Sequence, residues 1–98
     1  MKKARNFCLT QNNFDALGDT LNYLRSLKCN YLLCGKEIAP TTGKVHGQIY
    51  VQFPTPHSLS VTGLRGAHFE KCRGSPEQNI KYCKKEGNVI VEEGPYTK

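Results

Sequence analysis

The stretch His46-Gly47-Gln48-Ile49-Tyr50-Val51-Gln52-Phe53 alternates as a β-strand with two unlike faces does. Successive side chains of a strand point to opposite sides, so Ile49, Val51 and Phe53 share one face, which is ordinary core. The other face carries His46, Gln48, Tyr50 and Gln52. There an imidazole and a carboxamide stand roughly 7 Å apart, where one small ligand or ion can touch both. The strand therefore predicts a core on one side and a binding site on the other.

The whole chain fits one compact domain with a polyanionic partner. It has 98 residues, of which 38% are hydrophobic, enough for a single core. The formal charge of +6 favours nucleic acid or an anionic membrane surface as partner. Membrane attachment is the weaker reading, because no apolar run approaches the roughly 20 residues that span a bilayer and no signal peptide follows Met1. We expect a soluble, intracellular protein.

The cysteines are expected to be reduced. They are odd in number, at five, with no Cys-x-x-Cys pair and no Cys/His spacing that suits zinc. Cys8, Cys29 and Cys83 are interpreted as small buried side chains, because nothing in the pattern indicates a catalytic thiol.

Periodicity and turn residues place further elements around the central strand. A leucine stripe predicts a helix over 15–28, and Ser75-Pro76-Glu77-Gln78 is a typical capped helix start, with Gly87 as the matching stop. Pro54 and Pro56 are expected to end the central strand, since proline cannot donate to the ladder. Further strands are predicted at 6–11, 30–37, 67–72 and 89–91.

The strand at 30–37 and the central strand form a hairpin across a loop at 40–43. Glu37 and His46 flank that loop, so they can be cross-strand neighbours. Together with Gln48 they offer a carboxylate, an imidazole and an amide oxygen, an open set suited to Mg²⁺ or Mn²⁺. Any one of these side chains alone is more often simply solvated. The set of three on one hairpin is what predicts a divalent metal site.

Tyr82 and Lys85 lie three apart on the predicted second helix, where both can reach one reacting group. On spacing alone, an exposed tyrosine beside solvating lysines is the commoner explanation. The functional alternative is nucleophilic attack of Tyr82 on a phosphorus atom. Lys85 then stabilises negative charge, and a metal polarises the phosphate.

Three ordered motifs resemble those of the rolling-circle replication initiators of small circular single-stranded DNA viruses, circoviruses above all. They are 7–12 (FCLTQN), 46–48 (HGQ) and 82–87 (YCKKEG), and the similarity also extends through 68–74. The resemblance implies an α+β fold, the HUH endonuclease fold, which is similar to an RNA-recognition motif. Its five-stranded antiparallel sheet has flanking helices, one of which carries the nucleophilic tyrosine opposite the metal-binding strand.

The resemblance also implies roles. Tyr82 would nick the origin strand, hold its 5′ phosphate and later rejoin ends, while Lys85 assists catalysis. Glu37, His46 and Gln48 would bind the metal, and the motif at 7–12 would contribute to origin recognition. Gln48 stands where most HUH proteins have a second histidine, so weaker binding of softer metals is expected. Thr10-Gln11 also departs from the usual circoviral form of its motif.

Basic residues independently predict DNA contacts around Tyr82. Between 65 and 85 there are six lysines and arginines against two acids, a surface suited to a phosphate backbone, although Lys84 falls outside the Tyr82 face. The partner expected from the resemblance is single-stranded DNA at a stem-loop origin, in the host nucleus. The residues predicted to contact DNA are Lys3, Arg5, Thr10, Asn12, Lys71, Arg73, Gln78 and Lys81.

The predicted domain is 1–94, with 95–98 as the start of a linker to a helicase domain outside this chain, through which the full-length protein would form oligomers. The main alternative is an RNA-recognition-motif-like module that binds single strands without catalysis. Against it, Gln48 stands where that module has a stacking aromatic. A third alternative, a plasmid-type relaxase or tyrosine transposase, shares the chemistry and matches the spacing less well.

Overall fold

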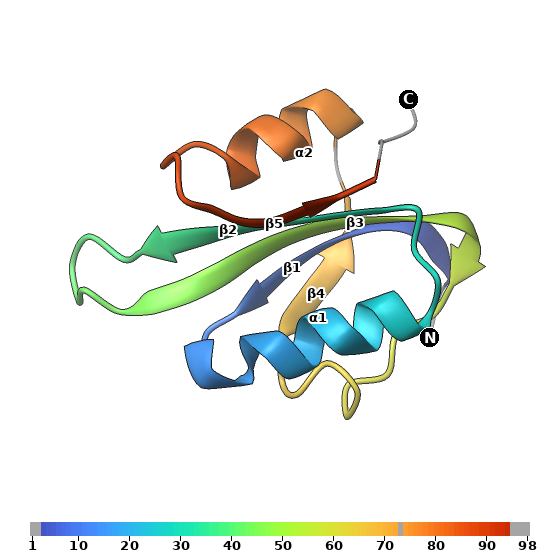
Figure 1. The fold of residues 1–98 in the computed structure, drawn as a ribbon, viewed down its shortest axis with the longest axis horizontal. Helices are drawn as coiled ribbons and strands as arrows, with labels where there is room; N and C mark the ends of the chain where they lie inside the picture. The colour runs from blue at the N-terminus through green and yellow to red at the C-terminus, as the bar shows by residue number, and fades with distance from the viewer. Residues whose placement is uncertain (1–2, 73, 95–98) are drawn as a thin grey trace.

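A computed structural model describes residues 3–72 and 74–94 and shows one antiparallel sheet between two helices (Figure 1). The strands lie in the order β4-β1-β3-β2-β5, and α1 and α2 cover opposite faces. This confirms the predicted α+β fold class with a five-stranded antiparallel sheet. The bounds are β1 Ala4–Gln11, η1 Phe14–Ala16, α1 Leu17–Ser26, β2 Tyr31–Ile38, β3 Val45–His57, β4 His68–Lys71, α2 Pro76–Cys83 and β5 Val89–Glu93.

The strand that contains residues 46–53, β3, is the centre of the sheet. It pairs with β1 on one side and with β2 on the other. Its alternation sorts side chains as predicted: Ile49 and Val51 join the core beneath α1, whereas Tyr50 joins a second cluster beneath α2. The sheet therefore has a face covered by α1 and a face covered by α2, which we call the α1 face and the α2 face.

β3 is longer than predicted, because it continues through both prolines to His57. The expectation that Pro54 ends the strand is wrong for a local reason. Pairing with β2 stops at Gln52, and the register with β1 shifts between Ala4 and Asn6. The prolines thus lie at positions of β3 where sheet pairing requires no backbone N–H donor. Their missing N–H groups therefore cost no sheet hydrogen bond.

The α1 face holds the main core. The predicted leucine stripe is confirmed: Leu17, Leu21 and Leu24 are buried on α1 and pack against the sheet. The helix is shorter than predicted, because the first turn after Asn13 is 3-10 and Leu27 is already its C-cap. This core fixes α1 to the sheet and leaves the other face to α2.

α2 begins as predicted but ends earlier. Ser75 and Gln78 form a reciprocal capping box, and Pro76 occupies the first turn. The helix ends at Cys83, and Gly87 takes a positive φ of 72° within the turn that follows. Lys85 therefore lies in this turn and not on the helix with Tyr82. A Cβ added at Gly35 of β2 would lie 2.1 Å from the Cys83 carbonyl oxygen, so the end of α2 rests directly on the sheet backbone.

Candidate active site on the α2 face

The hairpin of β2 and β3 places Glu37 directly opposite His46, as predicted. His46 Nε2 lies 2.5 Å from Glu37 Oε1. Their side chains are only 14% and 16% exposed, so solvent weakens this contact little. A carboxylate and an imidazole thus meet at one end of the α2 face.

Lys85 connects this pair to Tyr82. Its Nζ lies 2.5 Å from Glu37 Oε2 and 4.0 Å from the centroid of the Tyr82 ring. The hydrogen bond with Lys85 is the largest cause that lowers the pKa of Glu37, and the bond with His46 acts in the same direction. The same contact with Glu37 raises the pKa of Lys85, so the lysine keeps its positive charge beside the tyrosine.

Gln48, the third predicted metal ligand, is held by β1. Its Oε1 accepts a hydrogen bond from Thr10 Oγ1 at 3.0 Å, and its Nε2 donates to the Leu9 carbonyl oxygen at 3.1 Å. Gln48 is only 9% exposed. The structure therefore brings Glu37 and His46 into contact and orients Gln48 two residues further along β3. Thr10, predicted to contact DNA, donates to the Gln48 amide oxygen in the structure.

Tyr82 borders a pocket that ends on Gln48. The pocket holds about 250 Å³, and the Tyr82 side chain is 49% exposed at its edge. Its remaining walls come from β1, the end of β4 and α2. The lining residues are Cys8, Thr10, Gln48, Glu70, Asn79, Tyr82 and Cys83.

Sequence reasoning missed four members of this pocket, namely Cys8, Glu70, Asn79 and Cys83. Cys8 is half-buried rather than a core residue, and its Sγ contacts Asn79 Oδ1 at 3.0 Å and Cys72 Sγ at 2.9 Å. Glu70 adds an acidic group to the wall. Cys8 shares the α2 face with Thr10 because the two lie two residues apart on β1, which is the sequence signal that could have found it.

The predicted ligand set fits a hard divalent cation in its donor chemistry. It supplies carboxylate and amide oxygens with one imidazole nitrogen, and the carboxylate already holds a cation, the Lys85 ammonium. In residues 3–72 and 74–94, no three His, Cys, Asp or Glu side chains form a group able to hold a metal. The predicted set contains two such side chains, and its third member is the amide of Gln48.

The described residues that were predicted to contact DNA come from several elements. Lys3 and Arg5 are exposed at the start of β1, whereas Asn12 is exposed just beyond its end. On the other elements Lys71 and Lys81 are exposed. Gln78 completes the cap of α2, and Lys84 pairs with Glu92 at 3.0 Å. Arg73 lies outside the described residues, as does the predicted linker at 95–98.

No helix among the described residues is long and apolar enough to cross a bilayer.

Comparison with known proteins shows similarity to replication proteins of small DNA viruses. Residues 4–86 match the family "Putative viral replication protein". The chain is 39% identical over 96 residues to the replication-associated protein of Human associated cyclovirus 1, covering 93% of this chain and 34% of that protein.

Two circovirus proteins are also similar. The replication-associated protein of Canary circovirus is 35% identical, with 93% of this chain and 32% of that protein covered. That of Beak and feather disease virus is 37% identical, with 92% and 32% covered. The chain thus spans about one third of the length of these curated relatives.

Proposed function

The chain belongs to the family of viral replication proteins, and we propose that it is a single-stranded DNA endonuclease that nicks and rejoins a replication origin through Tyr82. One observation carries the proposal. Tyr82 stands half-exposed beside a pocket of about 250 Å³, with the Lys85 ammonium 4.0 Å from its ring centroid and Glu37 anchoring that ammonium. A phosphate of a single strand in this pocket would meet the phenol and the ammonium together.

In the proposed reaction the Tyr82 oxygen attacks phosphorus as the bond from phosphorus to the 3′ oxygen breaks. The phenol loses its proton, the departing 3′ oxygen gains one, and the 5′ phosphate stays on the tyrosine. Phenols titrate near pH 10, so attack at neutral pH needs a nearby cation. Lys85 stabilises the developing phenolate and the charge on the phosphate. Attack by a 3′ hydroxyl on the phosphotyrosine reverses the step and rejoins a strand.

The proposed cofactor is Mg²⁺ or Mn²⁺, held by Glu37, His46 and Gln48. When bound there, it supplies Lewis-acid polarisation of the scissile phosphate. Glu37 contributes in a second way, because its contact with Lys85 positions the ammonium over Tyr82. Thr10 contributes by fixing the Gln48 amide, since it donates to the amide oxygen.

The proposal extends to the whole protein, of which this chain is about one third if the protein is as long as its relatives. Its substrate would be a stem-loop origin, its site of action the host nucleus, and a helicase domain beyond 95–98 would assemble it into oligomers. The charge of +6 supports a nucleic-acid partner.

The test is incubation of the purified chain with a labelled single-stranded oligonucleotide that carries a circovirus-like origin loop, with Mn²⁺ or with a chelator. Wild type should produce a nick and a DNA adduct that survives denaturation, both only with metal. Tyr82→Phe should produce neither. Tyr23→Phe, a hydroxyl deletion on α1, serves as the matched control and should react as wild type does.

Three outcomes would contradict parts of this proposal. Binding of the oligonucleotide without a nick or an adduct, with either metal and over several loop sequences, would favour the module that binds without catalysis. Nicking that persists in Tyr82→Phe would place the nucleophile elsewhere. Unchanged Mn²⁺ binding in Glu37→Ala and His46→Ala would refute the metal assignment alone.

A further inference from the structure

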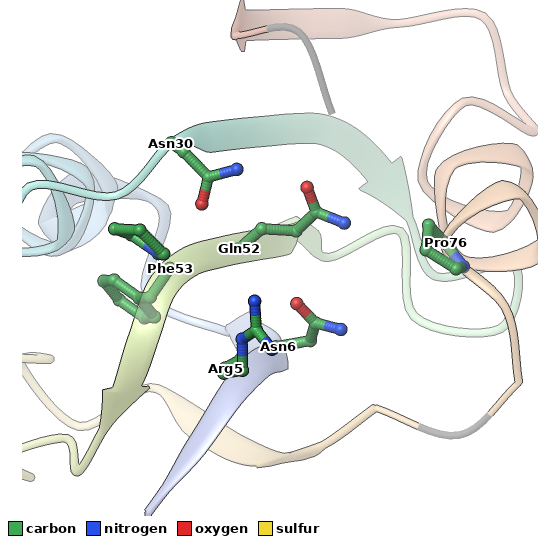
Figure 2. A pocket seen from close by; sticks show the side chains of 7 residues that line it. Arg5, Asn6, Asn30, Gln52, Phe53 and Pro76 are labelled. Carbon is green, nitrogen blue, oxygen red and sulfur yellow. The ribbon is translucent and has the colours of Figure 1, made fainter. Parts of the chain in front are cut away.

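A second, larger pocket lies at the other end of the α2 face. It holds about 570 Å³, within the roughly 300–1,000 Å³ range of small-molecule sites. It opens where β1, β2 and β3 come together beneath the first turn of α2 (Figure 2). The lining residues are Arg5, Asn6, Asn30, Gln52, Phe53, Pro54 and Pro76.

The described lining of this pocket combines carboxamides with a cation. Asn6, Asn30 and Gln52 come from three segments and gather around one space, with the guanidinium of Arg5 next to them. Among the lining residues that the structure describes, Arg5 is the only charged one. Carboxamides both donate and accept hydrogen bonds, which is what the edges of nucleobases require, and a guanidinium suits a phosphate.

The Gln52 amide is held in place by a hydrogen bond within the protein. Gln52 is 3% exposed, and its Nε2 donates to the Tyr50 hydroxyl at 2.9 Å, so its side chain is positioned before any ligand arrives. Phe53 is buried, and its ring stacks on His57, so it gives the pocket a wall and no free stacking surface. Recognition here would rest on hydrogen bonds to a base edge more than on stacking.

The pocket lies within reach of a strand that reacts at Tyr82. Gln48 lines the Tyr82 pocket and Gln52 lines this one, four residues apart on β3 and so about 13 Å along the strand. At about 3.4 Å per nucleotide a stacked strand covers this span in about four nucleotides, and an extended strand in fewer. We propose that this pocket binds one nucleobase of the substrate strand, about two to four nucleotides from the scissile phosphate. The inference rests on the function proposed above.

The test is a binding cycle in the Tyr82→Phe background, which keeps the strand uncut. Dissociation constants are measured by fluorescence anisotropy for the origin-loop oligonucleotide and for versions with one abasic site at each position around the scissile linkage. In the chain that keeps Asn6, an abasic site at one position should weaken binding about tenfold. In the chain that also carries Asn6→Ala, the same abasic site should weaken binding less than about threefold. Asn22→Ala on α1 is the matched control and should leave the abasic penalty at that position unchanged.

Asn6→Ala that weakens every oligonucleotide equally, or not at all, would overturn the base-binding pocket. So would an abasic penalty that Asn6→Ala leaves intact at every position. A urea unfolding curve of Asn6→Ala distinguishes misfolding from the loss of contacts to the base. Asn30→Ala must then reduce the abasic penalty at the same position as Asn6→Ala does. Nicking by the wild-type chain with no coupling refutes the pocket alone, whereas coupling in a chain that never nicks refutes the endonuclease alone.

Discussion

The two faces of the sheet bury polar side chains for different purposes. On the α1 face, Gln11 is 2% exposed, and its amide donates to Thr20 and to the carbonyl oxygens of Leu64 and Arg65. It ties the loop before β4 to α1. On the α2 face, Gln48 and Gln52 are also buried, yet each lines a pocket. A buried amide therefore braces a loop on the α1 face, whereas the buried amides of Gln48 and Gln52 line pockets on the α2 face.

The apolar contacts follow the same division. The α1 face carries the main core cluster, which includes Leu24, Ile49 and Val51, whereas the buried members on the α2 face are Tyr31, Leu33, Tyr50 and Cys83. Since free energy of burial scales with apolar area, stability should depend mainly on the α1 face. Substitutions on the α2 face should then change activity more than stability, and each prediction below tests that separation.

The largest expected effect is on catalysis. Lys85→Met should slow single-turnover nicking by about 10²- to 10⁴-fold, because the phenolate loses its cation. Unfolding free energy should change by less than about 1 kcal/mol, since this lysine side chain is 41% exposed. Mn²⁺ affinity, measured by titration calorimetry, should not fall, because Glu37 loses a competing cation. Lys28→Met, after α1, is the control. Normal nicking in Lys85→Met with slow nicking in Lys81→Met would move the assisting role to Lys81 on α2.

The next effect is on stability. Leu24→Ala removes a side chain with 0% exposure from the α1 face and should cost about 2–5 kcal/mol of unfolding free energy in urea. Leu27→Ala, at a partly buried position beside the same cluster, should cost less. Nicking per folded molecule should stay at the wild-type rate in both. A loss of specific activity in Leu24→Ala under conditions where it is folded would show that the faces are coupled.

Much of the fold could be predicted from local signals. The alternation over 46–53, the leucine stripe and the capping box at Ser75 depend on neighbours in sequence, and the structure confirms all three. The errors have long-range causes. β3 passes Pro54 because pairing with β2 stops at Gln52 and the register with β1 shifts there, and α2 ends at Cys83 because the chain must turn onto β5. Neither cause can be read from the residues at the boundary.

The candidate site was predictable only in part. The pairing of Glu37 with His46 follows from the hairpin, which depends on a single loop. The contact of Lys85 with Glu37 joins β2 to a turn far along the chain, and no periodicity indicates it. The same is true of Thr10 and Gln48, which are cross-strand partners only because of the register between β1 and β3. Motif order suggested that these segments meet, but not which atoms touch.

An intermediate effect is expected where α2 rests on the sheet. Gly35→Ala places a Cβ against the backbone oxygen of Cys83, which cannot move without shifting the end of α2. It should cost about 1–3 kcal/mol of unfolding free energy and also lower the nicking rate, because Tyr82 and Lys85 flank Cys83. Gly18→Ala on α1 meets nothing within 4 Å and should be neutral or stabilising by up to about 1 kcal/mol. Equal effects of both changes would contradict the close approach.

The smallest effect is expected for Glu92 and Glu93, two neighbouring residues of β5 whose side chains contact opposite faces of the sheet. Glu92 accepts from the Tyr31 hydroxyl at 2.7 Å and pairs with Lys84, whereas Glu93 pairs with Arg25 of α1 at 2.8 Å. The hydrogen bond from Tyr31 is the largest cause that lowers the pKa of Glu92, and that from Arg25 does so for Glu93.

A lowered pKa in the folded state gives stability that is present above the ordinary value of about 4.5 and is lost as the pH falls through the folded-state value. Glu92→Gln and Glu93→Gln should each cost less than about 1 kcal/mol at pH 7, because both carboxylates are exposed. Both costs should shrink in urea unfolding as the pH falls below about 4.5, because protonation of the carboxylates then removes the stabilisation. Only Glu92→Gln should also slow nicking, because Lys84 lies next to Lys85 in the turn that carries the ammonium. Slower nicking in Glu93→Gln alone would mean that β5 positions the site from the α1 face.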